Sequence, residues 1–144
     1  MPWFFPFLLS WLLFAVFLDC NRLKETLPFG FITMAMELLV DISAVKLGLY
    51  DIDLQVVNFF GVSLFFTIGP AFTLGILYVQ NIPKNKLMIV INTVVWALMF
   101  MAEEVLWVRE GAIVYINWSH IKSLCVDIGA FTLLAVLYYK KRAA

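Results

Sequence analysis

Residues 87–108 read LMIVINTVVWALMFMAEEVLWV, and this apolar run decides the class of the protein. As a helix with a rise of about 1.5 Å per residue it is about 33 Å long, enough to cross the apolar core of a bilayer, which is about 30 Å thick. Of the 144 residues, 64% are hydrophobic and 14% are charged, whereas soluble domains have about 45–50% and about 25%. The sequence therefore predicts an integral membrane protein.

Four further apolar stretches flank this run, and short polar connections separate them. The pattern predicts an all-α, polytopic integral membrane bundle of five transmembrane helices in a single domain, residues 1–144. The predicted spans are residues 3–18, 28–48, 57–79, 87–108 and 121–139.

The basic residues divide unequally between the two ends of such a bundle. Five spans place Lys46, Arg109 and Lys122 at one end. The other end takes Arg22, Lys24, Lys84, Lys86, Lys140, Lys141 and Arg142. Because Lys and Arg accumulate in cytoplasmic loops, we expect a multi-pass protein of the bacterial cell (plasma) membrane. Its N-terminus should lie outside and its C-terminus in the cytoplasm, with membrane lipids around it.

Carboxyl groups inside the predicted spans are the strongest functional feature. Glu37 and Asp41 lie one helical turn apart in the second span, Glu103 and Glu104 lie in the fourth, and Asp127 lies in the last. A charged residue at the bilayer centre costs about 2.5–3.5 kcal/mol on insertion scales, so it usually faces a polar interior, a cavity or a ligand. We expect an acidic pocket open to the outer face, with Glu104 rather than Glu103 facing inward.

The same carboxyl groups also have a structural interpretation. Two acids one turn apart do not both ionise easily in a medium of low dielectric constant. Neutral acids that hydrogen-bond to neighbouring helices would simply hold the bundle together. The sequence leaves both interpretations open.

Two segments 63 residues apart share a pattern of acid, three residues, Val, base, one residue and Gly. The first is DISAVKLG, residues 41–48, and the second is EVLWVREG, residues 104–111. Each ends a span that reaches the outer face, so the second and third spans form a possible parallel repeat with the fourth and fifth. We expect Gly48 and Gly111 to cap their helices.

The repeat also suggests how the charges are balanced. An acid and a base five residues apart point about 140° away from each other on a helix. We therefore expect Asp41 to pair with Arg109 and Glu104 to pair with Lys46 across the bundle, with His120 as a further partner.

The stretch that begins at Glu104 carries a family resemblance. Gly111 follows after six residues, and NWSH, residues 117–120, follows after five more. This order resembles the Glu-x6-Gly-x5-Asn-Trp-x-His motif of an uncharacterised family of small five-helix membrane proteins, found mainly in Gram-positive, often spore-forming bacteria. The resemblance covers residues 100–125 and implies a fold but no known activity. Tyr115 is displaced from its usual position in the motif, and a proline early in the last helix is missing.

A second, shorter similarity involves residues 102–107, AEEVLW. They are similar to the Pro-x-Glu-Glu motif of the small helical membrane modules of bacterial carotenoid cyclases, without the proline. This similarity implies a membrane enzyme, an isomerase or cyclase that uses a protonated carboxyl group as general acid on an apolar substrate.

Together these features predict a non-enzymatic protein that binds a small solute or cation, or assists its transport. A membrane enzyme and a structural subunit of a membrane complex are the alternatives. The predicted ligand-binding site or polar network consists of Glu37, Asp41, Lys46, Glu104, Arg109, Asn117, His120 and Asp127.

Other classes of function have no support in the sequence. It has no phosphate-binding loop and no metal-ligand spacing, so we expect neither a metal nor a cofactor. Ten basic and ten acidic residues give no basic footprint for nucleic acid. Five short spans leave little room for a transport pathway, so transport would require a homo-oligomer or a membrane partner protein.

Overall fold

The apolar run at residues 87–108 forms one uninterrupted helix in the computed structural model of the protein, which describes residues 2–55 and 57–143. The side-chain oxygen of Asn85 accepts a hydrogen bond from the backbone N–H of Leu87 at 2.9 Å and caps its first turn. The helical elements are α1 (Phe4–Phe17), η1 (Cys20–Arg22), α2 (Leu23–Lys46), α3 (Leu64–Phe66), η2 (Thr67–Ala71), α4 (Phe72–Gln80), α5 (Lys86–Arg109) and α6 (His120–Ala143). The strands are β1 (Tyr50–Ile52), β2 (Asn58–Phe59), β3 (Val62–Ser63) and β4 (Ile113–Tyr115).

Three of the helices are long and apolar enough to cross a membrane. They are the continuous stretch Cys20–Lys46, α5 and α6. Two further helices are apolar but shorter, α1 and the segment Leu64–Gln80, in which α3, η2 and α4 follow one another. The mostly helical bundle is therefore as expected, and three of its helices are suited to span a membrane.

The helix predicted to start at residue 57 begins later, at Leu64. The residues before it form a tight hairpin of β2 and β3, in which Phe60 and Gly61 have positive φ angles of 51° and 89°. The side-chain oxygen of Asn58 accepts the backbone N–H of Gly61 at 2.9 Å. This turn was missed because its residues continue the apolar composition of the span.

The segment Leu64–Gln80 packs closely against α2. A methyl group added at Gly75 would lie 2.1 Å from Oγ1 of Thr33, and one added at Gly30 would lie 2.8 Å from the ring of Phe72. These glycines therefore allow the two backbones to approach each other. Within the segment, η2 is a π-helical turn around Pro70, which has no backbone N–H to donate.

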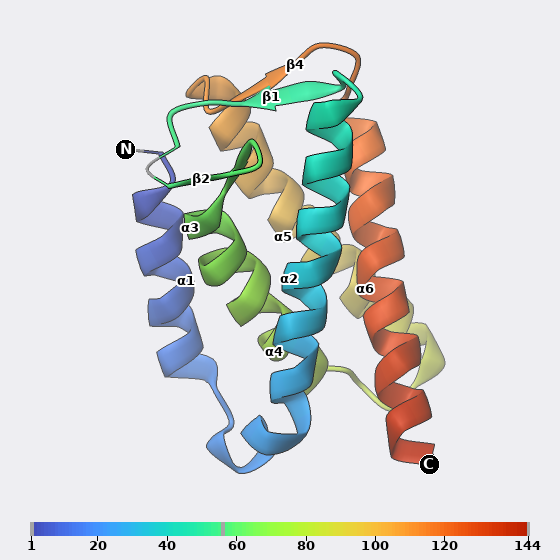
Figure 1. The fold of residues 1–144 in the computed structure, drawn as a ribbon. Coiled ribbons are helices and arrows are strands. Elements are labelled where there is room, and N and C mark those ends of the chain that lie inside the picture. The colour runs from blue at the N-terminus through green and yellow to red at the C-terminus, as the bar shows by residue number, and fades with distance from the viewer. Residues whose placement is uncertain (1, 56, 144) are drawn as a thin grey trace.

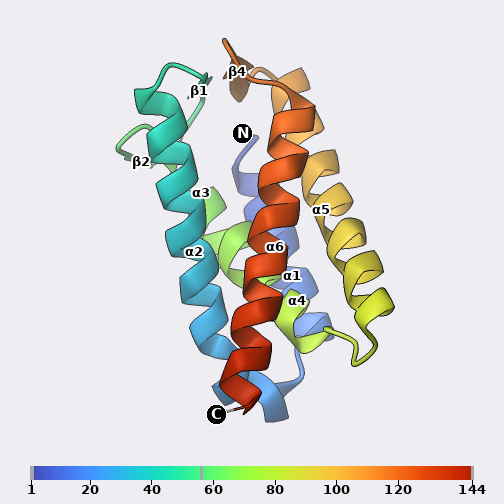
Figure 2. The same cartoon turned by 90° about the vertical axis from the view of Figure 1, so that its right-hand side faces the viewer.

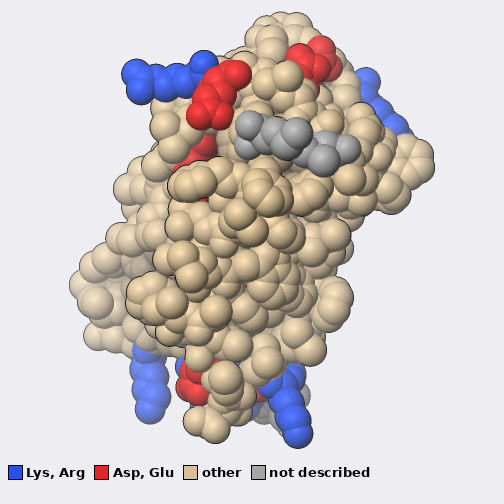
Figure 3. Space-filling view, turned by 90° about the vertical axis from the view of Figure 1, so that its left-hand side faces the viewer, with Lys and Arg blue, Asp and Glu red and all other residues tan. Residues whose placement is uncertain are grey.

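Figures 1 and 2 show how the five helices are arranged. The N-terminal end of α1 and the strands β1 and β4 lie at one end of the bundle, which we name the ribbon end. The connection from α1 to α2, the connection from α4 to α5 and the C-terminus lie at the opposite end. The helices run up and down between the two ends. Seven basic residues lie toward the opposite end and three toward the ribbon end. Figure 3 shows charged side chains gathered at both ends, with a broad uncharged band between them.

Glycines turn the chain at the ends of α2 and α5. Gly48 and Gly111 have φ angles of 65° and 72°, a left-handed conformation that favours glycine. Their backbone N–H groups donate to the carbonyl oxygens of Val45 at 3.0 Å and Val108 at 3.2 Å. Both helices therefore end in the same capped turn, as the spacing predicted.

The segments after these turns pair as an antiparallel β-ribbon over the end of the bundle (Figure 1). The paired residues are Tyr50 with Tyr115, Asp51 with Val114, and Ile52 with Ile113. Side chains alternate along a strand, so the tyrosines and isoleucines share the inner face, while Asp51 and Val114 are exposed.

The hydrogen bonds that flank the ribbon repeat at the offset of 63 residues. The backbone N–H of Asp53 donates to the carbonyl oxygen of Ala112 at 2.8 Å, and that of Ile116 donates to Leu49 at 3.0 Å. Each donor and each acceptor has its counterpart 63 positions away. The ribbon consequently has an approximate two-fold axis through its central residue pair.

Candidate functional site

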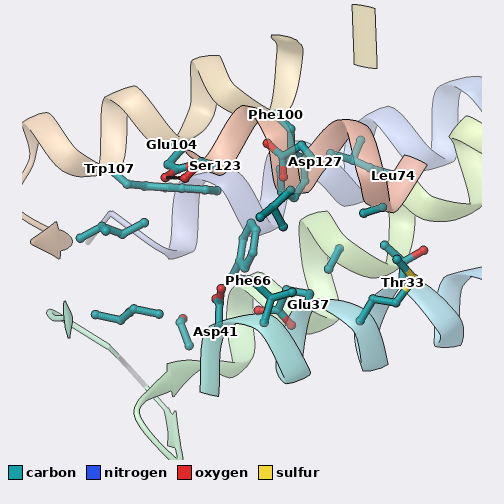
Figure 4. A pocket seen from close by; sticks show the side chains of 18 of the residues that line it. Thr33, Glu37, Asp41, Phe66, Leu74, Phe100, Glu104, Trp107, Ser123 and Asp127 are labelled. Atoms are coloured by element: carbon teal, nitrogen blue, oxygen red, sulfur yellow. Dashed lines mark hydrogen bonds between the residues drawn. The ribbon is translucent and has the colours of Figure 1, made fainter. Parts of the chain in front are cut away.

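A cavity of about 130 Å³ lies in the ribbon half of the bundle. Four carboxyl groups line it: Glu37 and Asp41 from α2, Glu104 from α5 and Asp127 from α6. In Figure 4 the first two lie on one wall, Glu104 and Asp127 lie on the opposite wall, and the ring of Phe66 lies between the two walls. The structure thus brings together four carboxyl groups that are up to 90 positions apart in the sequence.

Asp41 is held by a side chain from the ribbon. The hydroxyl of Tyr50 donates to its Oδ1 at 2.5 Å. The capped turn at Gly48 makes this contact possible, because it folds the strand back over the last turn of α2. Burial and the nearby Asp41 carboxyl raise the pKa of Tyr50 well above its usual range, so its hydroxyl keeps its proton.

Glu104 has a more extensive set of partners. Its Oε1 accepts hydrogen bonds from the hydroxyl of Tyr115 and, at 2.6 Å, from Oγ of Ser123. The indole N–H of Trp118 donates to the same Ser123 oxygen at 2.7 Å, and Nδ1 of His120 lies 3.1 Å from the Tyr115 hydroxyl. Burial and the hydrogen bond to Glu104 raise the pKa of Tyr115 above its usual range.

The two carboxyl–tyrosine pairs face each other across the ribbon. Asp41 and Glu104 are 63 residues apart, and their partners Tyr50 and Tyr115 are directly opposite each other in the ribbon, with ring centroids 6.4 Å apart. Each strand is therefore hydrogen-bonded through its tyrosine to the helix that precedes it.

Several polar atoms at the cavity have no partner within residues 2–55 and 57–143. Oδ2 of Asp127 and Oγ of Ser63 are buried and make no hydrogen bond. The buried carboxyl of Glu37 lies against the side chains of Asp41 and Thr67. Ser63 is only 1% exposed and lines the cavity. A buried polar atom left without a partner costs about 1–3 kcal/mol, so a polar guest or water in the cavity would stabilise these atoms.

Aromatic rings form another part of the lining. Trp3 stacks on Trp107 with ring centroids 5.3 Å apart, and Phe66 meets Trp107 edge-on at 4.8 Å. The indole N–H of Trp3 donates to the backbone oxygen of Asp53 at 2.8 Å, which fixes the ring. The three rings therefore form a rigid, electron-rich surface beside the carboxyl groups.

The predicted ion pairs between Asp41 and Arg109 and between Glu104 and Lys46 are wrong. Both bases are exposed and neither lines the cavity. They lie in the last turns of their helices, about 140° around from the acids, where a long side chain reaches water. Tyrosine hydroxyls take the places that the bases were expected to fill.

The remaining predicted residues lie at the edge of the site. Asn117 is exposed, and its backbone oxygen accepts a hydrogen bond from Nζ of Lys122 at 3.0 Å. His120 is half-buried and meets the site only through Tyr115. Neither of the two predicted residues lines the cavity.

The inward orientation of Glu104 agrees with the expectation, since Glu103 lines a separate groove beside Phe5 and Leu9 of α1. The sequence did not indicate Tyr50, Ser63 or Ser123. Apolar and polar residues alternate after Gly48, but only over a few residues, and after Gly111 they do not alternate, so no periodic signal marked the ribbon. Nothing in the sequence marks the two serines.

Within the described residues, no group of three or more His, Cys, Asp or Glu side chains is arranged to hold a metal ion. Comparison of the chain with protein-family models, with curated proteins and with solved structures finds no match.

Proposed function

We propose that this protein is a multi-pass protein of a bacterial plasma membrane that binds a small cationic solute in the cavity, alone or as an accessory to a transport process. One observation carries the proposal: the cavity is lined by four carboxyl groups and, among the described residues, by no Lys, Arg or His. A bound cation would favour the ionised form of these carboxyl groups and would give partners to the carboxyl oxygens that lack them.

The orientation in the membrane follows from the basic residues. Seven of them lie at the end that holds the C-terminus, which we propose is cytoplasmic. The ribbon end is then outside, and all five helices cross the membrane. The helix Leu64–Gln80 has 17 residues, and at about 1.5 Å per residue it is about 26 Å long. Its burial among the other helices makes this short length tolerable.

Access to the cavity involves the ribbon. Tyr50, Ile52 and Ile113 line the cavity from the ribbon's inner face, so the outer side of the cavity is covered. A solute that arrives from outside would have to displace the ribbon. The pocket that the sequence predicted to be open to the outer face is therefore proposed as a covered site.

We also propose that the chain belongs with the small five-helix membrane proteins that share its Glu-x6-Gly-x5-Asn-Trp-x-His motif. The motif residues Trp118 and His120 both reach Glu104 through one intermediate side chain, Ser123 and Tyr115 respectively. The motif residues would then position the Glu104 carboxyl group in the cavity.

A membrane enzyme is the second candidate, and the apolar lining favours it. Leu74, Phe100 and Phe131 face the same space as the buried carboxyl group of Glu37. An acid in such surroundings is suited to protonate an apolar substrate. The small volume would admit only one end of a long isoprenoid chain.

Native mass spectrometry of the protein released from its own membrane in mild detergent tests the proposal. We expect a retained small cation in the wild type and in Glu103→Gln, and its loss in the double variant Glu37→Gln/Asp127→Asn. The Glu103 variant is the matched control because that acid lies in a separate groove. If the wild type retains only bulk lipid or a partner protein, the carboxyl groups are structural. If lipid extract is converted and Glu37→Gln abolishes the conversion, the protein is an enzyme.

A further inference from the structure

The size of the cavity restricts the solute. Its volume is about 130 Å³, and an apolar cavity of about 150 Å³ is known to hold benzene, which has six carbon atoms. A guest of about six non-hydrogen atoms therefore matches this volume. A whole lipid would extend beyond it.

The lining argues against a bare metal ion. Calcium requires six to eight oxygen ligands and magnesium an octahedron of six, and no suitable cluster of acidic side chains exists in the described part of the chain. Most of the surface consists of rings and aliphatic side chains, among them Trp3, Phe66 and Trp107. Aromatic faces attract organic cations, whose apolar groups also gain from leaving water.

The buried polar atoms restrict the charged group. The two oxygens of Glu37 and Oδ2 of Asp127 are acceptors when ionised, and the hydroxyl of Ser63 can accept as well. Ser63 directly precedes the helical segment and lines the same cavity, and its buried hydroxyl, which has no partner among the described residues, is a further acceptor for a guest. A primary ammonium group has three N–H donors, whereas a quaternary ammonium has none.

From this combination of size, wall and acceptors we infer that the cavity binds a small primary alkylammonium ion, with its nitrogen near Glu37, Asp127 and Ser63 and its carbon chain against Trp107 and Phe66. This inference rests on the proposed function and specifies its ligand. Asp41 and Glu104 are already engaged by tyrosine hydroxyls, so they contribute charge rather than the principal hydrogen bonds.

The experiment compares the binding of three cations of equal charge and one neutral alcohol to the protein in zwitterionic lipid nanodiscs. Equilibrium dialysis measures n-pentylammonium, which has six non-hydrogen atoms, against tetramethylammonium, potassium ion and neutral pentanol. Quenching of tryptophan fluorescence reports the same binding, since Trp3, Trp107 and Trp118 line the cavity. We expect pentylammonium to bind about tenfold or more tightly than the other three, because hydrogen bonds to charged groups contribute about 1.5–3 kcal/mol.

Variants connect the binding to the cavity. Ser63→Ala removes a single hydroxyl from the site, and we expect it to weaken pentylammonium binding several-fold with no change in the thermal unfolding midpoint. Glu37→Gln should weaken binding about tenfold or more, whereas Glu103→Gln should leave it unchanged. Ser63→Ala leaves every carboxyl group in place. Its effect on pentylammonium binding therefore still tests the inference if Glu37→Gln does not fold.

The outcomes separate this inference from the proposed function. If tetramethylammonium or potassium binds as tightly as pentylammonium and the binding is sensitive to Glu37→Gln, the ammonium inference is overturned while a cation site remains. If no cation binds, or if the binding is the same in all variants, both are overturned. If pentanol binds as well as pentylammonium, the cavity selects for apolar shape and the inference is likewise overturned.

Discussion

The two ends of the bundle treat buried polar side chains differently. At the end that holds the C-terminus, both polar atoms of the Gln80 side-chain amide are hydrogen-bonded. The oxygen accepts from the backbone N–H of Asp19 at 3.0 Å. The nitrogen donates to Oγ1 of Thr26 at 3.1 Å and to the Asp19 carbonyl at 3.2 Å. Arg22 completes this network, with donations to the Gln80 carbonyl at 2.5 Å and to the Tyr138 hydroxyl at 2.6 Å.

At the ribbon end, the cavity contains Asp127 and Ser63 with atoms that make no hydrogen bond to the described chain, and Glu37, whose carboxyl lies against a second acid, Asp41. The same helices, α2 and α6, take part in both regions. A polar group that only holds helices together is satisfied by its neighbours. The contrast shows what a structural polar cluster looks like in this fold, and the acidic cavity does not have that appearance.

The largest expected effect is on the helix contact that both regions depend on. Gly75→Ala places a methyl group 2.1 Å from Oγ1 of Thr33 and 2.7 Å from its Cβ. We expect a loss of about 3 kcal/mol in the free energy of unfolding, measured by denaturation in detergent. Gly129→Ala on α6 is the control: nothing lies within 4 Å of the added methyl, so it should be neutral or stabilise by up to about 1 kcal/mol. Equal effects of both variants would show that α2 and α4 do not approach each other in this way.

The second prediction tests the comparison directly. Gln80→Leu leaves the backbone N–H of Asp19 without a partner and removes the hydrogen bond that the Thr26 hydroxyl accepts, so we expect it to lower the free energy of unfolding by about 2 kcal/mol. Glu37→Gln should change it by less than about 0.5 kcal/mol in the absence of a ligand, because the amide keeps the shape of the carboxyl and can still hydrogen-bond to Asp41 and Thr67. A large loss in Glu37→Gln and none in Gln80→Leu would reverse the assignment of the two regions.

A smaller effect is expected where the ribbon is fastened to the helices. Tyr50→Phe removes the hydrogen bond to Asp41 and should lower the free energy of unfolding by about 1–2 kcal/mol. It should also increase hydrogen exchange at the backbone amide of Asp53, which bonds across the ribbon. Unchanged exchange at this amide would mean that the tyrosine does not hold the ribbon in place.

The smallest effect is a pH dependence at the alkaline limit. The pKa values of Tyr50 and Tyr115 are raised above the usual value of about 10, so above that pH the unfolded chain releases protons that the folded chain retains. Stability should therefore decrease as the pH rises above about 10, and these tyrosines should produce no such change below it. Phenolate absorbance measures this: removal of either residue, as Tyr50→Phe or Tyr115→Phe, should leave the phenolate signal near pH 10 unchanged. A decrease in that signal would show that the tyrosines titrate normally.

The sequence was sufficient for the helices and for the turns that end them. Long apolar runs specify spans directly, and Gly48 and Gly111 mark helix ends because only glycine adopts their backbone conformation without strain. The inward position of Glu104 followed from the same helical geometry. These properties are local, so they can be read from neighbouring residues.

Contacts between distant segments were not accessible in this way. The partners of Asp41 and Glu104 were expected to be Arg109 and Lys46, since opposite charges suggest pairs. Which side chain reaches a buried carboxyl depends on where the chain goes after the helix, and the three-residue strands that decide this are too short to give a periodic signal. The start of the third span was misplaced for a related reason: the hairpin before Leu64 is as apolar as the helix that follows it.

The two-fold ribbon has a consequence for how the protein can assemble. Each half of the chain contributes one strand, so neither half can complete the ribbon alone. Two copies of the first half would pair through the same backbone bonds but would place Asp51 opposite a second Asp51, and like charges directly opposite each other repel. In the actual chain Val114 occupies that position. The unlike residues at the axis therefore favour joining of the two different halves over self-association of either one.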